Sequence, residues 1–508
     1  MFNMSSTAKR LAKGSALRTV EFFTTALITL AMTPFIIHSL GDEVYGLWIF
    51  VGSFLGYYGL MDFGLNSAVQ RFLSCAMGKK SAEEANKVIN TALGIFAVIG
   101  FMALIVSLVI AFALPVLIKN ITEVDLFRKI ILVLGLNFAI GFPLRVFSGI
   151  LSANIRYDLI TAIGLVKVLV RTLLIIIFLK NGHGIMALAF ITFATDISAY
   201  VTKYFIVRNL YKYIVFSRAL IDKSLMKPLF EYSTYTFITM IADQLRFNID
   251  NIVIAMFIGL GSVTLYSIAS RLVKYFKDFI ASAVGVLTPL FSQYEARKDY
   301  HSIREKFIIT TKISSYLSIM VGGILIIFGK AFIERWVGIK YIDAYSILLV
   351  LVIPMACALM QNPSIQLLFG ISKHKFYMVS NSIEGIVNLI LSLSLVKRYG
   401  ILGVALGTAI PMIFIKLFVQ PVYTCRVIKL GVRKYYLEAV LQPILNSMAI
   451  FMVFWLVLKD CIVPNYLILM ALISTVIVLF ICCIFFLGFK RVEWNYFKKI
   501  IFDTKGSR

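Results

Sequence analysis

The stretch VINTALGIFAVIGFMALIVSLVIAFA, residues 88–113, contains no charged side chain. The hydrocarbon core of a bilayer is about 30 Å thick, and an α-helix needs about 20 predominantly apolar residues to cross it. A soluble domain would interrupt so long an apolar run every few positions. Residues 88–113 are therefore predicted to cross a membrane as one helix.

The composition of the whole chain leads to the same conclusion. The protein has 508 residues, of which 60% are hydrophobic and only 15% are charged. In a soluble globular domain about a quarter of the residues are charged. Most of this chain must therefore be surrounded by lipid.

Apolar runs of similar length recur along the sequence, separated by glycine, proline or charged residues. About fourteen spans are expected on the length criterion, at residues 20–38, 44–64, 88–113, 129–151, 160–179, 184–205, 232–257, 264–290, 309–329, 344–369, 377–396, 401–424, 438–458 and 466–488. The sequence thus predicts an all-α polytopic membrane protein.

The basic residues indicate how the chain is oriented. The formal net charge is +25, but Lys and Arg are divided among short loops and do not form one solvated basic face, which argues against a nucleic-acid partner. About 31 of them lie on the side that carries the N-terminus and about 10 on the other. Positively charged loops are retained in the cytoplasm. Both termini are therefore predicted to be cytoplasmic.

The sequence offers little to support catalysis or metal binding. The six cysteines contain no C-x-x-C pair, and the four histidines have no partner at metal-ligand spacing. The external loops are predicted to be too short to hold a soluble catalytic domain. We expect a protein that is not an enzyme and has no metal site or bound cofactor.

An internal repeat is visible when the two halves are aligned. Residues 40–48 resemble residues 258–266 in shape, with Gly41 matching Gly259; Leu73-Ser74 then falls on Phe291-Ser292, and Gly184 on Gly403 at nearly the same spacing. Repeats of this kind are frequent in transporters. We predict two pseudo-symmetric six-helix bundles, an N-lobe at 1–215 and a C-lobe at 216–430. Residues 431–508 would add two C-terminal helices and a basic interfacial tail on the cytoplasmic side.

One segment resembles a known family. Leu40-Gly41-Asp42-Glu43-Val44-Tyr45-Gly46-Leu47-Trp48 is followed by Tyr57, Leu60, Asp62, Phe63, Gly64, Leu65, Ala68 and Arg71. Together they resemble the amino-terminal signature of the O-antigen and exopolysaccharide flippases of the multidrug/oligosaccharidyl-lipid/polysaccharide exporter superfamily. Supporting matches are residues 250–254 (DNIVI) and 400–407 (GILGVALG).

The resemblance implies a fold and a cargo. It implies two six-helix lobes around a central cavity, alternating access, and an undecaprenyl-diphosphate-linked glycan as cargo. Multidrug extruders of the superfamily usually have about twelve spans, so the extra pair expected here favours the glycan-lipid branch. The expected partners are this lipid-linked glycan, the phospholipid bilayer and polysaccharide polymerase machinery in a bacterial cytoplasmic membrane.

Charged residues inside the predicted spans are candidates for the site, because a charge in hydrocarbon is costly unless it faces a wet cavity or a partner. Two triplets have spacings of three and four residues, which place each set on one helical face: Asp243, Arg246 and Asp250, and Arg271, Lys274 and Asp278. We predict that Arg246, Arg271 and Lys274 bind the diphosphate. The alternative is structural, with Arg246–Asp250 and Lys274–Asp278 as i,i+4 ion pairs.

Further candidates follow from the same rule. The N-lobe cations are Lys167, Arg171 and Arg145, and the carboxylates that could couple transport to a proton or sodium gradient are Asp196, Asp243 and Asp250. Arg18 and Glu21 are explained by snorkelling to the inner surface. Residues that could contact sugar hydroxyls are Asn66, Asn381, Glu384 and Asn388. A helix-packing network is an equally good explanation for the three in the C-lobe.

Two other functions remain open. A multidrug or metabolite cation antiporter of the same superfamily would need a carboxylate-dominated cavity, whereas the candidates here are mixed and lean basic. A membrane-embedded polysaccharide polymerase or ligase would need a long external loop with a catalytic Arg or His, and the sequence predicts no such loop. The leading hypothesis is a flippase for lipid-linked oligosaccharides.

Overall fold

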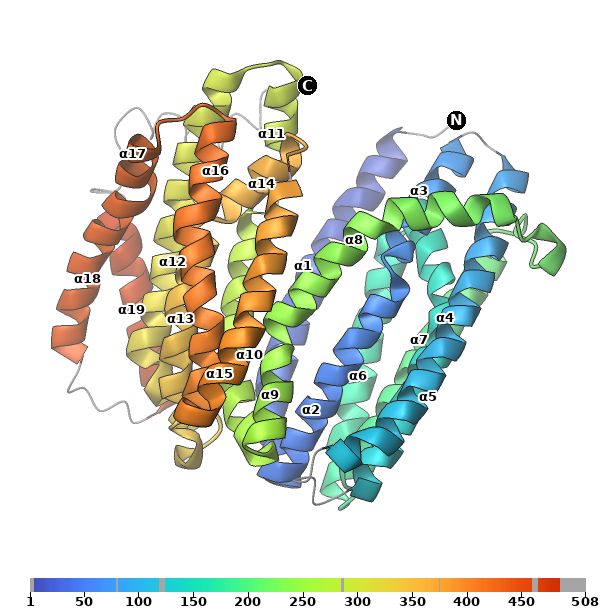
Figure 1. The fold of residues 1–508 in the computed structure, drawn as a ribbon, viewed down its shortest axis with the longest axis horizontal. Helices are drawn as coiled ribbons and strands as arrows, with labels where there is room; N and C mark the ends of the chain where they lie inside the picture. Colours follow the sequence, from blue (N-terminus) through green and yellow to red (C-terminus); the bar gives the residue numbers. More distant parts are fainter. Residues whose placement is uncertain are drawn as a thin grey trace. The chain divides into compact units, whose positions relative to one another are not determined.

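A computed structural model describes residues 4–78, 81–117, 124–284, 287–373, 375–458 and 465–484. All regular structure in these ranges is helical (Figure 1). Nine helical runs within them are long and apolar enough to cross a membrane, judged by length and composition. The chain is an all-α polytopic membrane protein, as predicted; the total of fourteen spans stays a prediction.

The chain divides into two compact units, Met1–Thr264 and Leu265–Arg508. We call them unit 1 and unit 2. The boundary lies within helix α10 (Leu260–Val284), so the helices of the seventh predicted span belong to unit 1. The predicted division into lobes at residues 215 and 430 stays a prediction.

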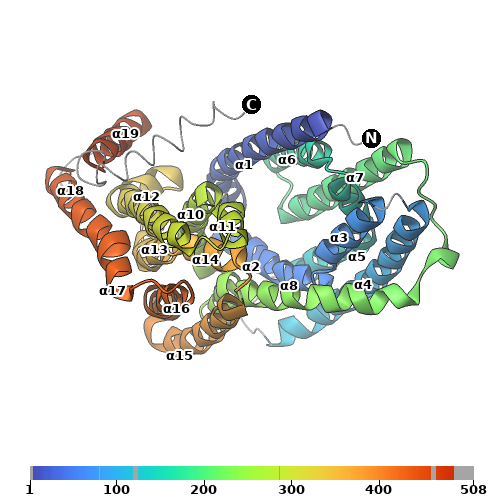
Figure 2. The same cartoon turned by 90° about the horizontal axis from the view of Figure 1, so that it is seen from above.

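Unit 1 contains both long and short helices. Within it α1 packs along α6, α4 along α5, and α5 along α7 (Figure 2). Its helices are α1 (Met4–Leu40), α2 (Asp42–Tyr58), α3 (Leu65–Gly78), α4 (Ala82–Leu117), α5 (Val124–Ala153), α6 (Tyr157–Lys180), α7 (Ile185–Leu210), α8 (Met226–Phe247) and α9 (Ile249–Phe257).

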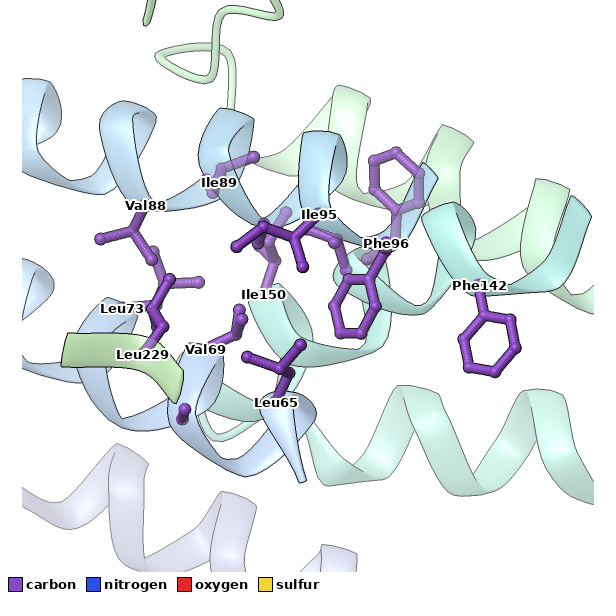
Figure 3. Packing of buried hydrophobic residues seen from close by; sticks show 14 of the residues in the cluster. Leu65, Val69, Leu73, Val88, Ile89, Ile95, Phe96, Phe142, Ile150 and Leu229 are labelled. Atoms are coloured by element: carbon purple, nitrogen blue, oxygen red, sulfur yellow. The ribbon is translucent and has the colours of Figure 1, made fainter. Parts of the chain in front are cut away.

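The core of unit 1 forms where α3 packs against α4, α5 and α8 (Figure 3). Leu65, Val69 and Leu73 recur every four residues on α3, so they form one apolar stripe along the helix. Each of the three is almost fully buried. The stripe meets Phe96 of α4 and Ile150 of α5 in one cluster. The core thus holds α3, a short helix without a predicted span of its own.

The segment between α7 and α8 is held by side chains of α4. Asn86 accepts a hydrogen bond from the backbone N–H of Val215 and donates one to the carbonyl of Tyr213, both at 3.0 Å. Asn90, one turn later, accepts a hydrogen bond from the backbone N–H of Ser217 and donates one to the carbonyl of Val215. Hydrogen bonds from Ser224 hold the pKa of Asp222, further along, below its usual range. This connection is therefore an ordered segment fixed to α4.

Unit 2 is centred on α12, which packs against α13, α18 and α19. Phe451 of α18 lies directly against Gly323 of α12, where a larger side chain would clash. The rest of unit 2 consists of α11 (Leu287–Ala296), α12 (Tyr300–Trp336), α13 (Ala344–Met360), α14 (Asn362–Gly370), α15 (Lys375–Phe414), η5 (Ile415–Val419), α16 (Gln420–Val427), α17 (Val432–Tyr435), η6 (Tyr436–Leu441), α18 (Gln442–Leu458) and α19 (Tyr466–Cys483). The predicted interfacial tail after residue 484 lies outside the described residues.

Several predicted continuous spans are interrupted. Span seven is broken at Asn248 between α8 and α9, and span ten at Gln361 between α13 and α14. Pro363 at the start of α14 explains the second break, because proline has no N–H to bond to the preceding turn. Span twelve continues from α15 through a π-helical turn, η5. Such turns frequently occur at functional sites.

Helix α15 contains two antiparallel halves joined at Gly400, whose φ of 58° lies in the left-handed region. The halves approach so closely that a Cβ on Gly403 would meet the carbonyl of Leu395, and one on Gly407 would meet Ser392. Thr408 also donates a hydrogen bond to Asn388 at 3.3 Å across the hairpin. Spans eleven and twelve are therefore one tightly closed helical hairpin.

We expect Gly407→Leu to separate the two halves of this hairpin and to lower the amount of protein in the membrane strongly, because overpacking a close contact typically costs about 1–3 kcal/mol or more. The measurement is membrane protein level by immunoblot. Leu402→Val, on the exposed side of the same hairpin, is the matched control and should leave the level unchanged. Equal levels of Gly407→Leu and wild type would show that the hairpin does not need this contact.

Candidate functional site

Five polar side chains of unit 1 meet between α5, α6 and α7; we call them the Asp196 cluster. Asp196 of α7 lies 2.6 Å from Nη2 of Arg171 and 3.1 Å from Nζ of Lys167, both on α6. Asn137 of α5 donates a hydrogen bond to the second carboxylate oxygen at 3.0 Å. Nε of Arg171 donates to Thr195 at 2.9 Å. Lys167, Arg171 and Asp196, predicted separately from the sequence, thus form one cluster.

The local sequence explains why these side chains converge. Lys167 and Arg171 are four residues apart, so they project from the same face of α6. That helix packs along α7, which carries Asp196 and Thr195. Each cation can therefore reach the same carboxylate from successive turns.

The cluster has more positive than negative charge. Two cations share one carboxylate, which leaves one formal positive charge. The side chains of Lys167 and Arg171 remain 31% and 27% exposed. Within the described residues, Nη1 of Arg171 and two of the three donors of Lys167 make no hydrogen bond to protein. The cluster therefore has donors to offer to an anion.

Two further charges belong to this region and were not predicted as site residues. Lys203 of α7 lies within electrostatic range of Lys167, Asp196 and Glu21, and donates a hydrogen bond to Ser148 of α5 at 3.0 Å. Glu21 of α1 approaches Gly164 on α6 closely. The sequence analysis explained Glu21 by snorkelling and did not single out Lys203. Their place near the cluster depends on packing between helices that are distant in sequence.

A second polar group surrounds Asp62, the last residue of the short 3-10 helix η1 (Gly59–Asp62) that follows α2. The guanidinium of Arg145 on α5 lies 3.9 Å from the Asp62 carboxylate and 4.4 Å from the centre of the Phe142 ring. The backbone N–H of Asn66 donates to the same carboxylate at 3.1 Å, while its side chain is exposed. Arg145 is thus paired with a carboxylate and lies over an aromatic ring.

The second-lobe candidates are described only in part. The side chains of Asp243 and Arg246 lie outside those that the structure describes. Asp250 is buried in the first turn of α9, where the helix dipole stabilises a carboxylate. Arg246 belongs to unit 1 and Arg271 with Lys274 to unit 2, so their shared anion-binding face stays a prediction.

Lys274 and Arg271 differ in environment on α10. Arg271 is half-buried, whereas Lys274 is exposed. Among the described side chains, Lys274 has no ion-pair partner, and its predicted i,i+4 pair with Asp278 is not formed. The structural alternative therefore does not explain why Lys274 is present.

Asn381, Glu384 and Asn388 are all almost fully buried in α15. Asn388 accepts a hydrogen bond from Ser392 at 2.9 Å. Asn381 and Glu384 contact Lys416, a residue that the sequence analysis did not single out. These contacts favour the packing alternative over contacts with sugar.

Lys416 could have been found by the rule used for the other candidates. It is the sole charged residue between 401 and 424, as Lys312 is between 309 and 329. Both lysines are 1% exposed. The described part of the chain contains no group of three or more His, Cys, Asp or Glu suited to a metal ion.

Comparison with known proteins places this arrangement in a family. A Shigella flexneri protein named "Putative O-antigen transporter" is 25% identical over 414 residues, covering 78% of this chain and 94% of that protein. The fold matches the lipid II flippase MurJ, inward closed, with a TM-score of 0.73, 18% identity and coverage of 91% and 97% of the two chains. It also matches an inward-facing multidrug resistance MATE transporter with a TM-score of 0.68 and 14% identity. That match covers 81% of this chain and 96% of the transporter. Residues 11–295 match the family described as "Polysaccharide biosynthesis protein". The chain belongs to this polysaccharide biosynthesis family.

Proposed function

We propose that this protein is a flippase that moves a polyprenyl-diphosphate-linked oligosaccharide across the bacterial cytoplasmic membrane by alternating access. The family membership and the name of the Shigella relative support an exporter in polysaccharide biosynthesis. A substrate of this kind combines a lipid tail that stays in the bilayer with a charged headgroup that must cross it. Fixed protein cations lower the barrier by replacing the water around the headgroup.

The Asp196 cluster is the observation that supports this proposal most directly. Lys167 and Arg171 are partly exposed, retain unused donors and exceed the charge of their carboxylate by one. A diphosphate supplies several acceptor oxygens, and a guanidinium can contact two of them at once. Asp196 holds the cations in position before the anion arrives, so the cluster needs little rearrangement to bind it.

Deletion in the native host tests the proposed function. The expected result is loss of a surface glycan, with its lipid-linked unit accumulating on the cytoplasmic leaflet. Both observations are needed, because a polymerase defect would also remove the polymer but would leave the unit on the outer leaflet. A deletion strain with unchanged surface glycan would contradict the proposal.

A cation antiporter of the same superfamily is the second transport function to weigh. Such a site would need an excess of carboxylates to bind a cationic drug. In the Asp196 cluster the cations exceed the carboxylates, and Lys274 adds a cation in unit 2 that has no ion-pair partner among the described side chains. These charges favour an anionic cargo.

The orientation of the termini is part of the proposal and has its own test. A topology reporter fused after Arg508 should give a cytoplasmic signal, since the side with more Lys and Arg stays in the cytoplasm. The same reporter placed after Gly182, in the turn between α6 and α7, is the matched control and should report the periplasm. A periplasmic signal after Arg508 would overturn the predicted topology.

We also propose that a proton or sodium gradient drives transport through Asp196, Asp243 or Asp250. A carboxylate in a cavity that opens alternately to the two sides of the membrane can bind a cation on one side and release it on the other. Replacing the responsible aspartate with asparagine should make transport insensitive to the gradient. If all three single variants retain wild-type gradient dependence, these residues are not the coupling site. The measurement is flipping in vesicles with and without an ionophore.

A further inference from the structure

The buried charge of Lys416 in unit 2 is surrounded by oxygen atoms and an aromatic ring. Its Nζ lies 2.7 Å from Oδ1 of Asn381, 3.1 Å from Oε1 of Gln420 and 3.3 Å from Oε2 of Glu384. The ring centre of Tyr377 is 5.0 Å away. We call these five residues the Lys416 cage. Lys416 and Glu384 are each only 1% exposed.

The cage is built by the α15 hairpin and the turn that follows it. Tyr377, Asn381 and Glu384 lie on the first half of α15, whereas Lys416 lies in the π-helical turn η5 and Gln420 begins α16. The π turn inserts an extra residue into the helix and so changes the direction of the side chains around it. It thereby places Lys416 where it can reach the opposite half of the hairpin.

Surrounding residues fix the cage oxygens. Nε2 of Gln420 donates a hydrogen bond to the carbonyl of Gln361 at 3.3 Å, which leaves its Oε1 for the ammonium. The hydroxyl of Tyr435 donates to Oε1 of the same Gln361 at 2.5 Å. Nδ2 of Asn381 has no hydrogen-bond partner among the described residues, although the residue is buried. The Asn381 carboxamide is thus committed to the cation through its oxygen alone.

We propose that the Lys416 cage is a monovalent-cation site that the protein fills with its own ammonium group. One carboxylate, two amide oxygens and an aromatic face are groups that also bind free ammonium or alkali-metal ions. The covalent tether keeps Lys416 at a high effective concentration, so the site is occupied in any salt. Unit 2 therefore keeps the charge of Glu384 compensated without taking a cation from solution. This inference does not depend on the identity of the cargo.

Removing the tethered ammonium should create a site for a dissolved one. We expect purified Lys416→Ala to unfold at a lower temperature than wild type, because the buried Glu384 loses its contact with the Lys416 ammonium. Its unfolding temperature should rise saturably with methylammonium, ammonium, sodium or potassium chloride, measured against N-methylglucamine chloride at constant ionic strength. This rise should exceed any change that wild type shows in the same salts. Lys87→Ala, which breaks the exposed Lys87–Glu83 pair, is the matched control and should show no preference among them.

A second variant separates a cation site from a generally weakened fold. Glu384→Gln in the Lys416→Ala background removes the negative charge and should abolish the cation dependence while raising the unfolding temperature in N-methylglucamine. Cation-independent unfolding of Lys416→Ala, or unchanged dependence in the double variant, would overturn the proposal. If Lys416→Ala is lost during extraction, folded protein should be recovered when methylammonium is present. Equal loss with and without methylammonium would count against the cage.

Discussion

Replacing Lys274 with alanine is expected to reduce export of the surface glycan strongly while leaving the amount of protein in the membrane unchanged. Lys274 is exposed and has no ion-pair partner among the described side chains, so its removal should change stability by no more than about 0.5 kcal/mol. A hydrogen bond to a charged group contributes about 1.5–3 kcal/mol. Loss of such a contact to the diphosphate should therefore reduce transport by roughly tenfold or more. Glycan staining and an immunoblot measure the two quantities.

Two companion variants make the Lys274 result interpretable. Lys274→Arg keeps the positive charge and should retain most export. Asp278→Ala should have little effect, because the Lys274–Asp278 pair is not formed in the described structure. If Asp278→Ala restored export to Lys274→Ala, the lysine would be acting through an ion pair. Normal export by well-expressed Lys274→Ala would remove it from the site.

The second large effect is expected at Arg171. Arg171→Ala removes the shorter of the two ion pairs to Asp196 and the hydrogen bond to Thr195. Export should fall by roughly tenfold or more, since a charge-assisted contact is lost from both the cluster and the cargo. Arg171→Lys should restore export only in part, because lysine cannot make the two-point contact of a guanidinium. Lys180→Ala, at the exposed end of the same helix, is the matched control.

A double variant distinguishes cargo binding from structural support at this cluster. Arg171→Ala leaves Asp196 with Lys167 and Asn137, so the cluster loses its formal excess of one positive charge. Adding Asp196→Asn restores the wild-type net charge of the cluster, with Lys167 carrying it. Export should remain low, because the guanidinium is still missing. Full recovery of export in the double variant would assign Arg171 to the fold alone.

The sequence was most informative where the hydrophobicity of a long run alone determines the structure. Long uncharged runs such as residues 88–113 predict helices in lipid regardless of their neighbours, and α4 spans that run. The position of Gly400 between two apolar runs marked the turn between spans eleven and twelve. By contrast, α3 is a short helix whose apolar stripe has meaning only against its packing partners. Its docking could not be read from local sequence.

The sequence could not predict which side chains contact one another between different helices. The sequence identified Lys167, Arg171 and Asp196 as candidates. Asn137 lies on α5 and Lys203 lies two turns further along α7, and both approach the candidates only because the helices pack together. Lys416 contacts Asn381 and Glu384 because Gly400 reverses the chain and a π turn redirects the side chain. A one-dimensional spacing rule has no access to such contacts. The rule for isolated mid-span charges applies to Lys416 as well, but the sequence analysis did not single that residue out.

Reconstituted transport tests the central claim most directly. The purified protein is placed in liposomes whose inner leaflet carries a fluorescently labelled polyprenyl-diphosphate oligosaccharide, and arrival of the label at the outer leaflet is followed with an impermeant quencher. The account predicts rapid arrival with wild-type protein, and arrival near that of protein-free liposomes with Lys274→Ala or Arg171→Ala. Arrival at the protein-free rate with folded wild-type protein under an imposed gradient of either sign would contradict it.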